Sequence, residues 1–104
     1  MKIAFDMDST LIYGDSPEHT FISPISGERE SLCDTPRYDV IAIFHAYEAM
    51  GFEMFIWSGS GVDYAKVKSA RLGLQATVVE KGSFRPDIAV DDQDVNLGIT
   101  NIRV

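Results

Sequence analysis

Short apolar runs that end in acidic or hydroxyl-bearing residues are the feature that most constrains the fold of this chain. Three of them lie at Lys2–Phe5, Phe52–Trp57 and Ile88–Val90. Asp6, Ser58 and Asp91 follow these runs directly. Runs of this kind, separated by segments of helical spacing, are typical of a parallel sheet with crossover connections. Because parallel strands end at the same edge of a sheet, the sequence predicts that these polar residues meet there.

The spacing of apolar residues predicts a helix between the first two of these strands. Asp34 or Thr35 can cap this helix, and Pro36 fits its first turn because no backbone N–H is needed there. Gly51 can adopt the left-handed conformation that ends a helix. The first crossover is therefore predicted to be helical.

The rest of the chain continues the alternation of helix and strand. A second helix is expected at Val62–Leu72, with Gly73 as its stop. Further strands are expected at Ala76–Val79 and at Ile102–Val104. This order predicts an α/β fold, namely a three-layer, doubly wound, Rossmann-like parallel sheet of about five strands.

The segment Tyr13–Asp34 departs from this pattern. It is polar and rich in turn residues, and Thr20–Ile25 is expected to form one arm of a small β flap. An insertion of about 22 residues is too short to form a separate cap domain. We therefore expect one domain over residues 1–104, with an open site that is shielded by this flap or by a partner subunit.

The composition of the chain argues against non-specific binding to nucleic acid and against membranes as partners. Nine Lys and Arg residues against 16 Asp and Glu residues give a formal charge of −7, which disfavours non-specific binding to nucleic acid. The single cysteine, Cys33, cannot form an internal disulfide. No apolar run approaches the roughly 20 residues of a membrane helix. These observations favour a cytoplasmic protein that does not bind membranes.

Acidic residues collect at the predicted strand ends. Asp6 and Asp8 come after the first strand, and Asp91 and Asp92 follow the run at Ile88–Val90. Two carboxylates about 4 Å apart repel each other by about 4 kcal/mol at an effective dielectric constant of about 20. A cluster of carboxylates therefore needs a counterion, and oxygen ligands without His or Cys favour Mg²⁺.

Three motifs resemble signatures of the haloacid dehalogenase-like (HAD) superfamily, in the order of that family. Residues 3–11 read IAFDMDSTL, which is similar to an apolar strand followed by Asp-x-Asp-x-Thr, in the form seen in phosphoserine phosphatases. Residues 55–59 read FIWSG and resemble the second signature, and residues 88–92 read IAVDD and resemble the acidic fourth one. The resemblance spans nearly the whole chain and implies a HAD-like fold without a cap domain.

The resemblance also implies roles for the matching residues. Asp6 would attack phosphorus to form an aspartyl-phosphate and would ligate Mg²⁺. Asp8 would protonate the leaving oxygen and then deprotonate the attacking water, and its backbone carbonyl would bind the metal ion. Ser58 and the N–H groups of Gly59 and Ser60 would hold phosphoryl oxygens, although Ser58 could instead serve only as a helix cap.

The third signature is the place where the sequence departs from the family pattern. Family members bring a Lys or Arg to the nucleophile and the phosphate, and residues 80–87 read EKGSFRPD. Lys81 matches the residue type and Arg85 precedes a proline, so Lys81 ranks first and Arg85 second. Asp91 and Asp92 would complete the metal site, with Asp92 the better candidate for the direct ligand. Asn96, four residues after Asp92, could support the metal site.

Together, the residues and the resemblance predict a Mg²⁺-dependent phosphohydrolase that hydrolyses phosphate monoesters through an aspartyl-phosphate. An open site would admit a small phosphorylated molecule or the end of a nucleic acid, and the chain could form a homo-oligomer. The alternative is a HAD-fold binding or regulatory module with little or no activity, or one that needs a partner protein. A basic residue beside Asp6 would weigh against this alternative, and a site without a cation would favour it.

Overall fold

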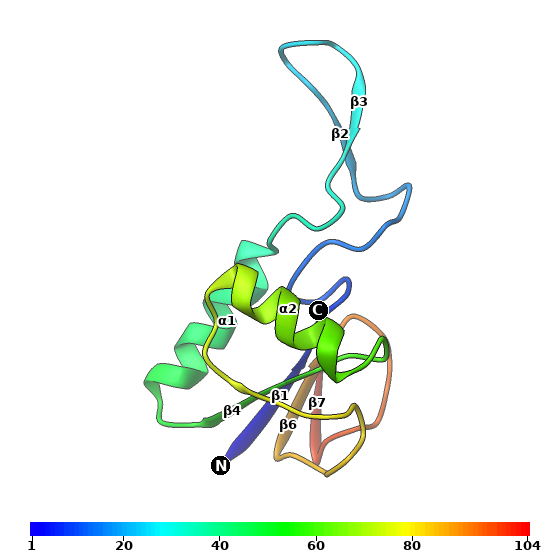
Figure 1. The fold of residues 1–104 in the computed structure, drawn as a ribbon. Helices are drawn as coiled ribbons and strands as arrows, with labels where there is room; N and C mark the ends of the chain where they lie inside the picture. The colour runs from blue at the N-terminus through cyan, green and yellow to red at the C-terminus, as the bar shows by residue number, and fades with distance from the viewer.

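The computed structural model describes residues 1–104 and consists of a parallel sheet, two helices and a two-stranded ribbon (Figure 1). The sheet contains β1 (Lys2–Asp6), β4 (Glu53–Trp57), β5 (Thr77–Val78), β6 (Ile88–Asp91) and β7 (Thr100–Arg103). The strand order is β5-β4-β1-β6-β7, and every neighbouring pair is parallel. The chain builds outward from β1 on one side and then on the other, which is the doubly wound topology expected from the sequence. The direction of winding changes between β1 and β6, which end in Asp6 and Asp91.

Both helices, α1 (Tyr38–Ala49) and α2 (Val62–Leu72), cover the same face of the sheet. Successive side chains of a strand point to opposite faces, and Phe5 of β1 points to the face with the helices. There it shares one buried cluster with Phe44 of α1 and Ala65 of α2. The ring centres of Phe5 and Phe44 lie 5.2 Å apart, so α1 is held against the central strand.

The opposite face of the sheet is covered by loops. Phe55 and Trp57 of β4 point to this face and pack against Phe84, whose ring centre lies 4.7 Å from that of Phe55. The third layer of the predicted three-layer fold therefore consists of loops and not of helices. The nine residues between β5 and β6 must cross β4 and β1 and return to the start of β6. A helix advances only about 1.5 Å per residue, so this connection is too short to contain one.

The start of α1 also differs from the prediction. The residue before the helix is Arg37, and no side chain caps the first turn. Asp34 has a φ of +64°, and Pro36 forms an isolated bridge with Ile12, so both residues belong to the segment that leads into the helix. The predicted helix stops are confirmed: Gly73 directly after α2, and Gly51 after the C-cap residue Met50 of α1, both adopt positive φ angles.

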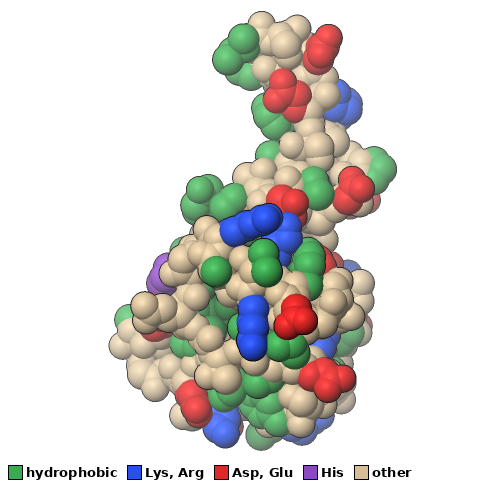
Figure 2. Space-filling model, viewed as in Figure 1, with side chains coloured by type: hydrophobic (Ala, Val, Ile, Leu, Met, Phe, Trp, Pro, Cys, Tyr) green, Lys and Arg blue, Asp and Glu red, His purple; other side chains and the backbone are tan.

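The predicted flap is a ribbon of two antiparallel strands, β2 (Thr20–Ile22) and β3 (Arg29–Ser31). It projects away from the rest of the molecule (Figure 1) and carries hydrophobic as well as charged side chains on its surface (Figure 2). The N–H of Leu32 donates to the carbonyl of His19 over 2.8 Å, which closes the base of the ribbon.

At the other end of the chain, β7 covers Thr100–Arg103 and so begins earlier than predicted. Neither helix has the length and apolar composition needed to span a membrane.

Candidate functional site

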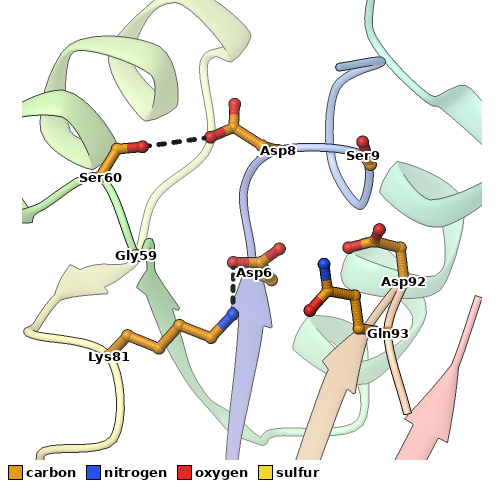
Figure 3. A pocket seen from close by; sticks show the side chains of 8 residues that line it. All are labelled: Asp6, Asp8, Ser9, Gly59, Ser60, Lys81, Asp92 and Gln93. Atoms are coloured by element: carbon orange, nitrogen blue, oxygen red, sulfur yellow. Dashed lines mark hydrogen bonds and ion pairs between the residues drawn. The ribbon is translucent and has the colours of Figure 1, made fainter. Parts of the chain in front are cut away.

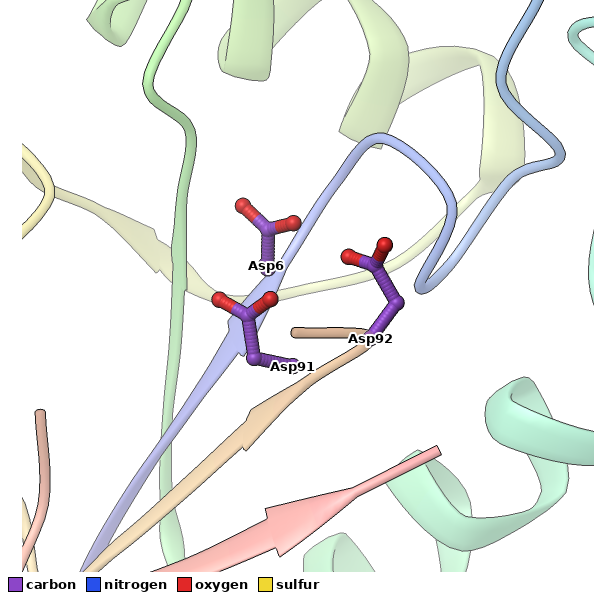
Figure 4. Close-up of side chains that lie close together, drawn as sticks. All are labelled: Asp6, Asp91 and Asp92. Atoms are coloured by element: carbon purple, nitrogen blue, oxygen red, sulfur yellow. The ribbon is translucent and has the colours of Figure 1, made fainter. Parts of the chain in front are cut away.

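The sheet brings three carboxylates together at the carboxyl ends of its central strands (Figure 4). Asp6 is the last residue of β1, Asp91 is the last residue of the neighbouring strand β6, and Asp92 follows it. One oxygen from each of the three lies within 4.8 Å of the others. Asp6 and Asp91 are buried and Asp92 is half-buried. This cluster is the arrangement that the strand ends predicted.

Lys81 supplies a positive charge to this cluster. Its Nζ lies 3.1 Å from Oδ1 of Asp6 and 2.9 Å from Oδ2 of Asp91, and it reaches the site from the loop after β5 (Figure 3). Arg85, the second candidate, is exposed and donates to Oδ1 of Asn96 over 3.1 Å. The prediction that Arg85 belongs to the site is therefore wrong, and Asn96 faces Arg85 instead of the carboxylates. Phe84, which precedes Arg85, packs on the face of the sheet that carries Phe55 and Trp57.

Thr10 connects two of the three carboxylates. Its buried hydroxyl accepts the backbone N–H of Asp92 over 3.1 Å. The same oxygen lies 3.2 Å from Oδ1 of Asp92 and 3.4 Å from Oδ2 of Asp6, so its proton can be donated to either carboxylate. The turn that follows β1 carries Thr10 back to this position, because the carbonyl of Met7 accepts the backbone N–H groups of residues 10–12.

The side chain of Asp8 lies apart from the three carboxylates and faces α2. Its Oδ1 accepts a short hydrogen bond from the hydroxyl of Tyr64, and its Oδ2 lies 3.5 Å from the hydroxyl of Ser60 (Figure 3). The carboxylate of Asp8 is thus not part of the group that could hold a metal ion, which consists of Asp6, Asp91 and Asp92. Burial and the neighbouring Asp8 carboxylate raise the pKa of the Tyr64 hydroxyl, which remains a hydrogen-bond donor.

The turn between β4 and α2 contains the residues of the second motif. Ser58 is buried, and its Oγ accepts the N–H of Ser60 over 3.0 Å. Ser58 therefore shapes this turn and does not line the cavity, whereas Gly59 and Ser60 do. Ser58 is not a helix cap, because Gly61 occupies the capping position of α2.

A cavity of about 300 Å³ lies over the carboxylates. It is open to solvent and is lined by polar residues and glycine, with no hydrophobic residue among them (Figure 3). The lining residues are Asp6, Asp8, Ser9, Gly59, Ser60, Lys81, Asp92 and Gln93. None of them belongs to the segment Tyr13–Asp34, so the expectation that this segment shields the site is wrong for this conformation.

The site carries an excess of negative charge. Burial and the Asp91 carboxylate raise the pKa of Asp6 to about 6, and Lys81 opposes this increase only in part. Burial and Asp91 also raise the pKa of Asp92. Burial disfavours the charge on Lys81, but Asp91 and Asp6 outweigh this effect and raise the pKa of the ammonium group. One lysine thus faces three carboxylates, and this donor set of oxygens with uncompensated charge fits a hard divalent cation.

Four residues in or beside the site were not predicted from the sequence, namely Ser9, Thr10, Tyr64 and Gln93. Thr10 lies in the first motif, and the run Asp-x-Asp-x-Thr was the signal that could have found it. Tyr64 lies in the first turn of α2, and only the rotation of this helix about its axis turns the hydroxyl toward Asp8.

Comparisons of the chain with protein-family models, with curated proteins and with solved structures found no match.

Proposed function

We propose that this protein is a Mg²⁺-dependent phosphohydrolase that hydrolyses phosphate monoesters through an aspartyl-phosphate. The observation that carries the proposal is the position of Asp6. Its carboxylate lies in a polar, open cavity, beside the ammonium group of Lys81 and two further carboxylates. The carboxylate of Asp8 lines the same cavity, but its hydrogen-bond partners are the hydroxyl groups of Ser60 and Tyr64.

In the first step, an oxygen of Asp6 forms a bond to phosphorus while the bond between phosphorus and the leaving oxygen breaks. Protonated Asp8 gives its proton to that leaving oxygen, so an alcohol departs. The bonding electron pair stays with the alcohol oxygen, and the phosphoryl group is attached to Asp6. Lys81 lowers the repulsion between the carboxylate of Asp6 and the incoming dianion, because its charge lies 3.1 Å from Oδ1.

In the second step, water hydrolyses the aspartyl-phosphate. Asp8, now ionised, takes a proton from the water whose oxygen attacks phosphorus. The bond between phosphorus and Asp6 breaks, which regenerates the carboxylate and releases inorganic phosphate. One residue therefore serves as acid and then as base, and its protonation state is restored at the end of each cycle.

Mg²⁺ would be held by the carboxylates of Asp6, Asp91 and Asp92. When bound, it supplies positive charge to the phosphoryl oxygens and balances the cluster of carboxylates. Thr10 supports this role because its hydroxyl and the backbone of Asp92 fix two of the three ligands relative to each other. Gly59 and Ser60 line the opposite wall, where the phosphoryl group would lie.

The cavity also indicates how the substrate would bind. No hydrophobic residue and no aromatic ring lines the cavity to hold the rest of a substrate. Recognition within the cavity is therefore directed at the phosphate, and the alcohol part would extend into solvent. A small phosphate monoester or a phosphorylated end of a larger molecule satisfies this requirement.

The alternative, a module that binds phosphate and metal without turnover, has less support. It was favoured by the incomplete third motif, which left the cation of the site unassigned. The contacts of Lys81 with Asp6 and Asp91 supply this cation. The alternative would be favoured again if phosphate and Mg²⁺ bound to the protein and no ester was hydrolysed.

Phosphate release from a panel of monoesters tests the proposal. The panel contains an aryl phosphate, an alkyl phosphate, nucleotides, sugar phosphates and a 5′-phosphorylated oligonucleotide, each with Mg²⁺ and with a chelator. We expect release from at least one of them that depends on Mg²⁺. Equal release in the presence of the chelator would contradict the assigned cofactor, and no release from any ester would contradict the assigned activity.

A further inference from the structure

The two oxygens of Asp8 have different hydrogen-bond partners, one exposed and one half-buried. The Ser60 hydroxyl lies 3.5 Å from Oδ2, at the limit of a hydrogen bond, and Ser60 is exposed. The Tyr64 hydroxyl makes a short contact with Oδ1 and is half-buried. Tyr64 is therefore the residue that determines the direction of the Asp8 carboxyl group.

Tyr64 is itself held in place from several sides. It lies in the first turn of α2, and its ring packs against the main hydrophobic cluster. The ammonium group of Lys68, one turn further along the helix, lies 5.5 Å from the centre of this ring. Lys68 in turn forms a 2.9 Å ion pair with Asp34 at the base of the ribbon. The phenol ring is thus fixed on a rigid element, which is a requirement for orienting another group.

We propose that Tyr64 is a positioning residue that fixes the Asp8 carboxyl group for proton transfer, an inference that rests on the proposed function. A tyrosine hydroxyl has one proton, and here it is donated to Oδ1. When Asp8 is protonated, its own proton therefore resides on Oδ2. That oxygen faces Ser60 of the cavity lining, and it gives its proton to the leaving oxygen and later accepts one from water.

This role makes the effect of Tyr64 depend on the leaving group. An alkoxide is a poor leaving group and needs a proton as its bond to phosphorus breaks. A nitrophenolate departs without protonation. Loss of the Tyr64 hydroxyl should therefore slow phosphoryl transfer from an alkyl phosphate much more than transfer from p-nitrophenyl phosphate. A merely structural role would lower both rates by the same factor.

The test compares Tyr64→Phe with the wild type in kcat/KM, which reports the steps up to departure of the alcohol. With glycerol phosphate and Mg²⁺, we expect kcat/KM to fall at least about 10-fold, a part of the 10²- to 10⁴-fold that general acid catalysis contributes. With p-nitrophenyl phosphate, we expect a change of less than about 3-fold. Tyr38→Phe is the matched control, because Tyr38 is 73% exposed on α1 and is not part of the site.

Equal losses with both substrates, no loss with either, or a variant that does not fold would each overturn the role of Tyr64. A second measurement repeats the comparison in an Asp8→Asn background, where Tyr64→Phe should have no further selective effect on the alkyl phosphate. A selective effect that persists there would contradict action through Asp8. Failure of the proposed function is distinguishable, because it would appear as absence of Mg²⁺-dependent turnover in the wild type.

Discussion

Lys81 and Arg85 lie four residues apart on one loop and have different surroundings. The ammonium group of Lys81 is half-buried between Asp6 and Asp91, whereas the guanidinium group of Arg85 is exposed beside Asn96. Removal of one partner from a buried ion pair leaves the other charges uncompensated. The two residues therefore form a natural pair for comparing the site with its surroundings.

We expect Lys81→Ala to lower kcat/KM for phosphate release at least about 100-fold, because such a loss corresponds to about 3 kcal/mol of transition-state stabilisation from one charged group. The matched substitution Arg85→Ala should change kcat/KM by less than about 3-fold. Steady-state kinetics at saturating Mg²⁺ measures both variants. A larger loss in Arg85→Ala than in Lys81→Ala would mean that Arg85, and not Lys81, supplies the positive charge in the proposed mechanism.

Much of the site could be predicted at the scale of single residues, because the ends of buried parallel strands determine where side chains collect. Asp6, Asp91 and Asp92 needed only the strand assignments. The choice between Lys81 and Arg85 depends on how Phe84 seats their loop on the sheet, a tertiary contact that the local sequence does not specify. Tyr64 was missed for a similar reason, since the rotation of α2 about its axis follows from the packing of the core.

At the scale of elements, the connection between β5 and β6 covers the face of the sheet that no helix covers, and it also contains Lys81 of the site. Phe84 covers this face because its ring packs against Phe55 and Trp57, whose ring centres lie 4.7 and 5.7 Å from its own. The stability of this loop is therefore coupled to the position of the lysine.

We expect Phe84→Ala to lower the free energy of unfolding by about 2–3 kcal/mol, somewhat less than for a fully buried phenylalanine, because Phe84 is half-buried. Chemical denaturation followed by circular dichroism measures this change. Phe21→Ala is the control, since Phe21 is 40% exposed on the ribbon, and it should cost less than about 1 kcal/mol. Equal costs for the two variants would mean that Phe84 does not act as a covering layer.

The strands and helices themselves were predicted well from apolar periodicity and from glycines at helix ends. The covering of one sheet face by loops follows from the length of one connection relative to the width of the sheet, whereas larger α/β folds place helices on both faces. The start of α1 was placed too early because Asp34 and Pro36 match helix-start preferences locally. In the folded chain, backbone hydrogen bonds between Tyr13 and residues 34 and 35 hold this segment at the base of the ribbon.

At the scale of the whole molecule, the ribbon makes the shape elongated, with principal extents of 46 × 25 × 24 Å. Its two strands pair with each other and with no strand of the central sheet. An isolated pair of strands contributes little independent stability in water. The sheet and its site should therefore fold without the outer part of the ribbon.

We expect that replacing residues 20–31 with a short glycine-containing turn leaves the fold intact, because His19 and Leu32 already meet through a 2.8 Å backbone hydrogen bond. The thermal midpoint should change by less than about 5 °C, which corresponds to about 1 kcal/mol for a domain of this size. Mg²⁺-dependent hydrolysis of a small monoester should change by less than about 3-fold. Loss of cooperative unfolding in the shortened protein would show that the ribbon is part of the folding unit.

The central claim concerns the Asp6 carboxylate, and the most direct test is phosphate release by Asp6→Asn from the best monoester of the wild type, with Mg²⁺ and with a chelator. Asp94→Asn is the matched control, because Asp94 is an exposed acid outside the cavity lining. We expect Mg²⁺-dependent turnover in the wild type and in Asp94→Asn, and a loss of at least about 1,000-fold in folded Asp6→Asn. Turnover by Asp6→Asn at the rate of the wild type would contradict the central claim.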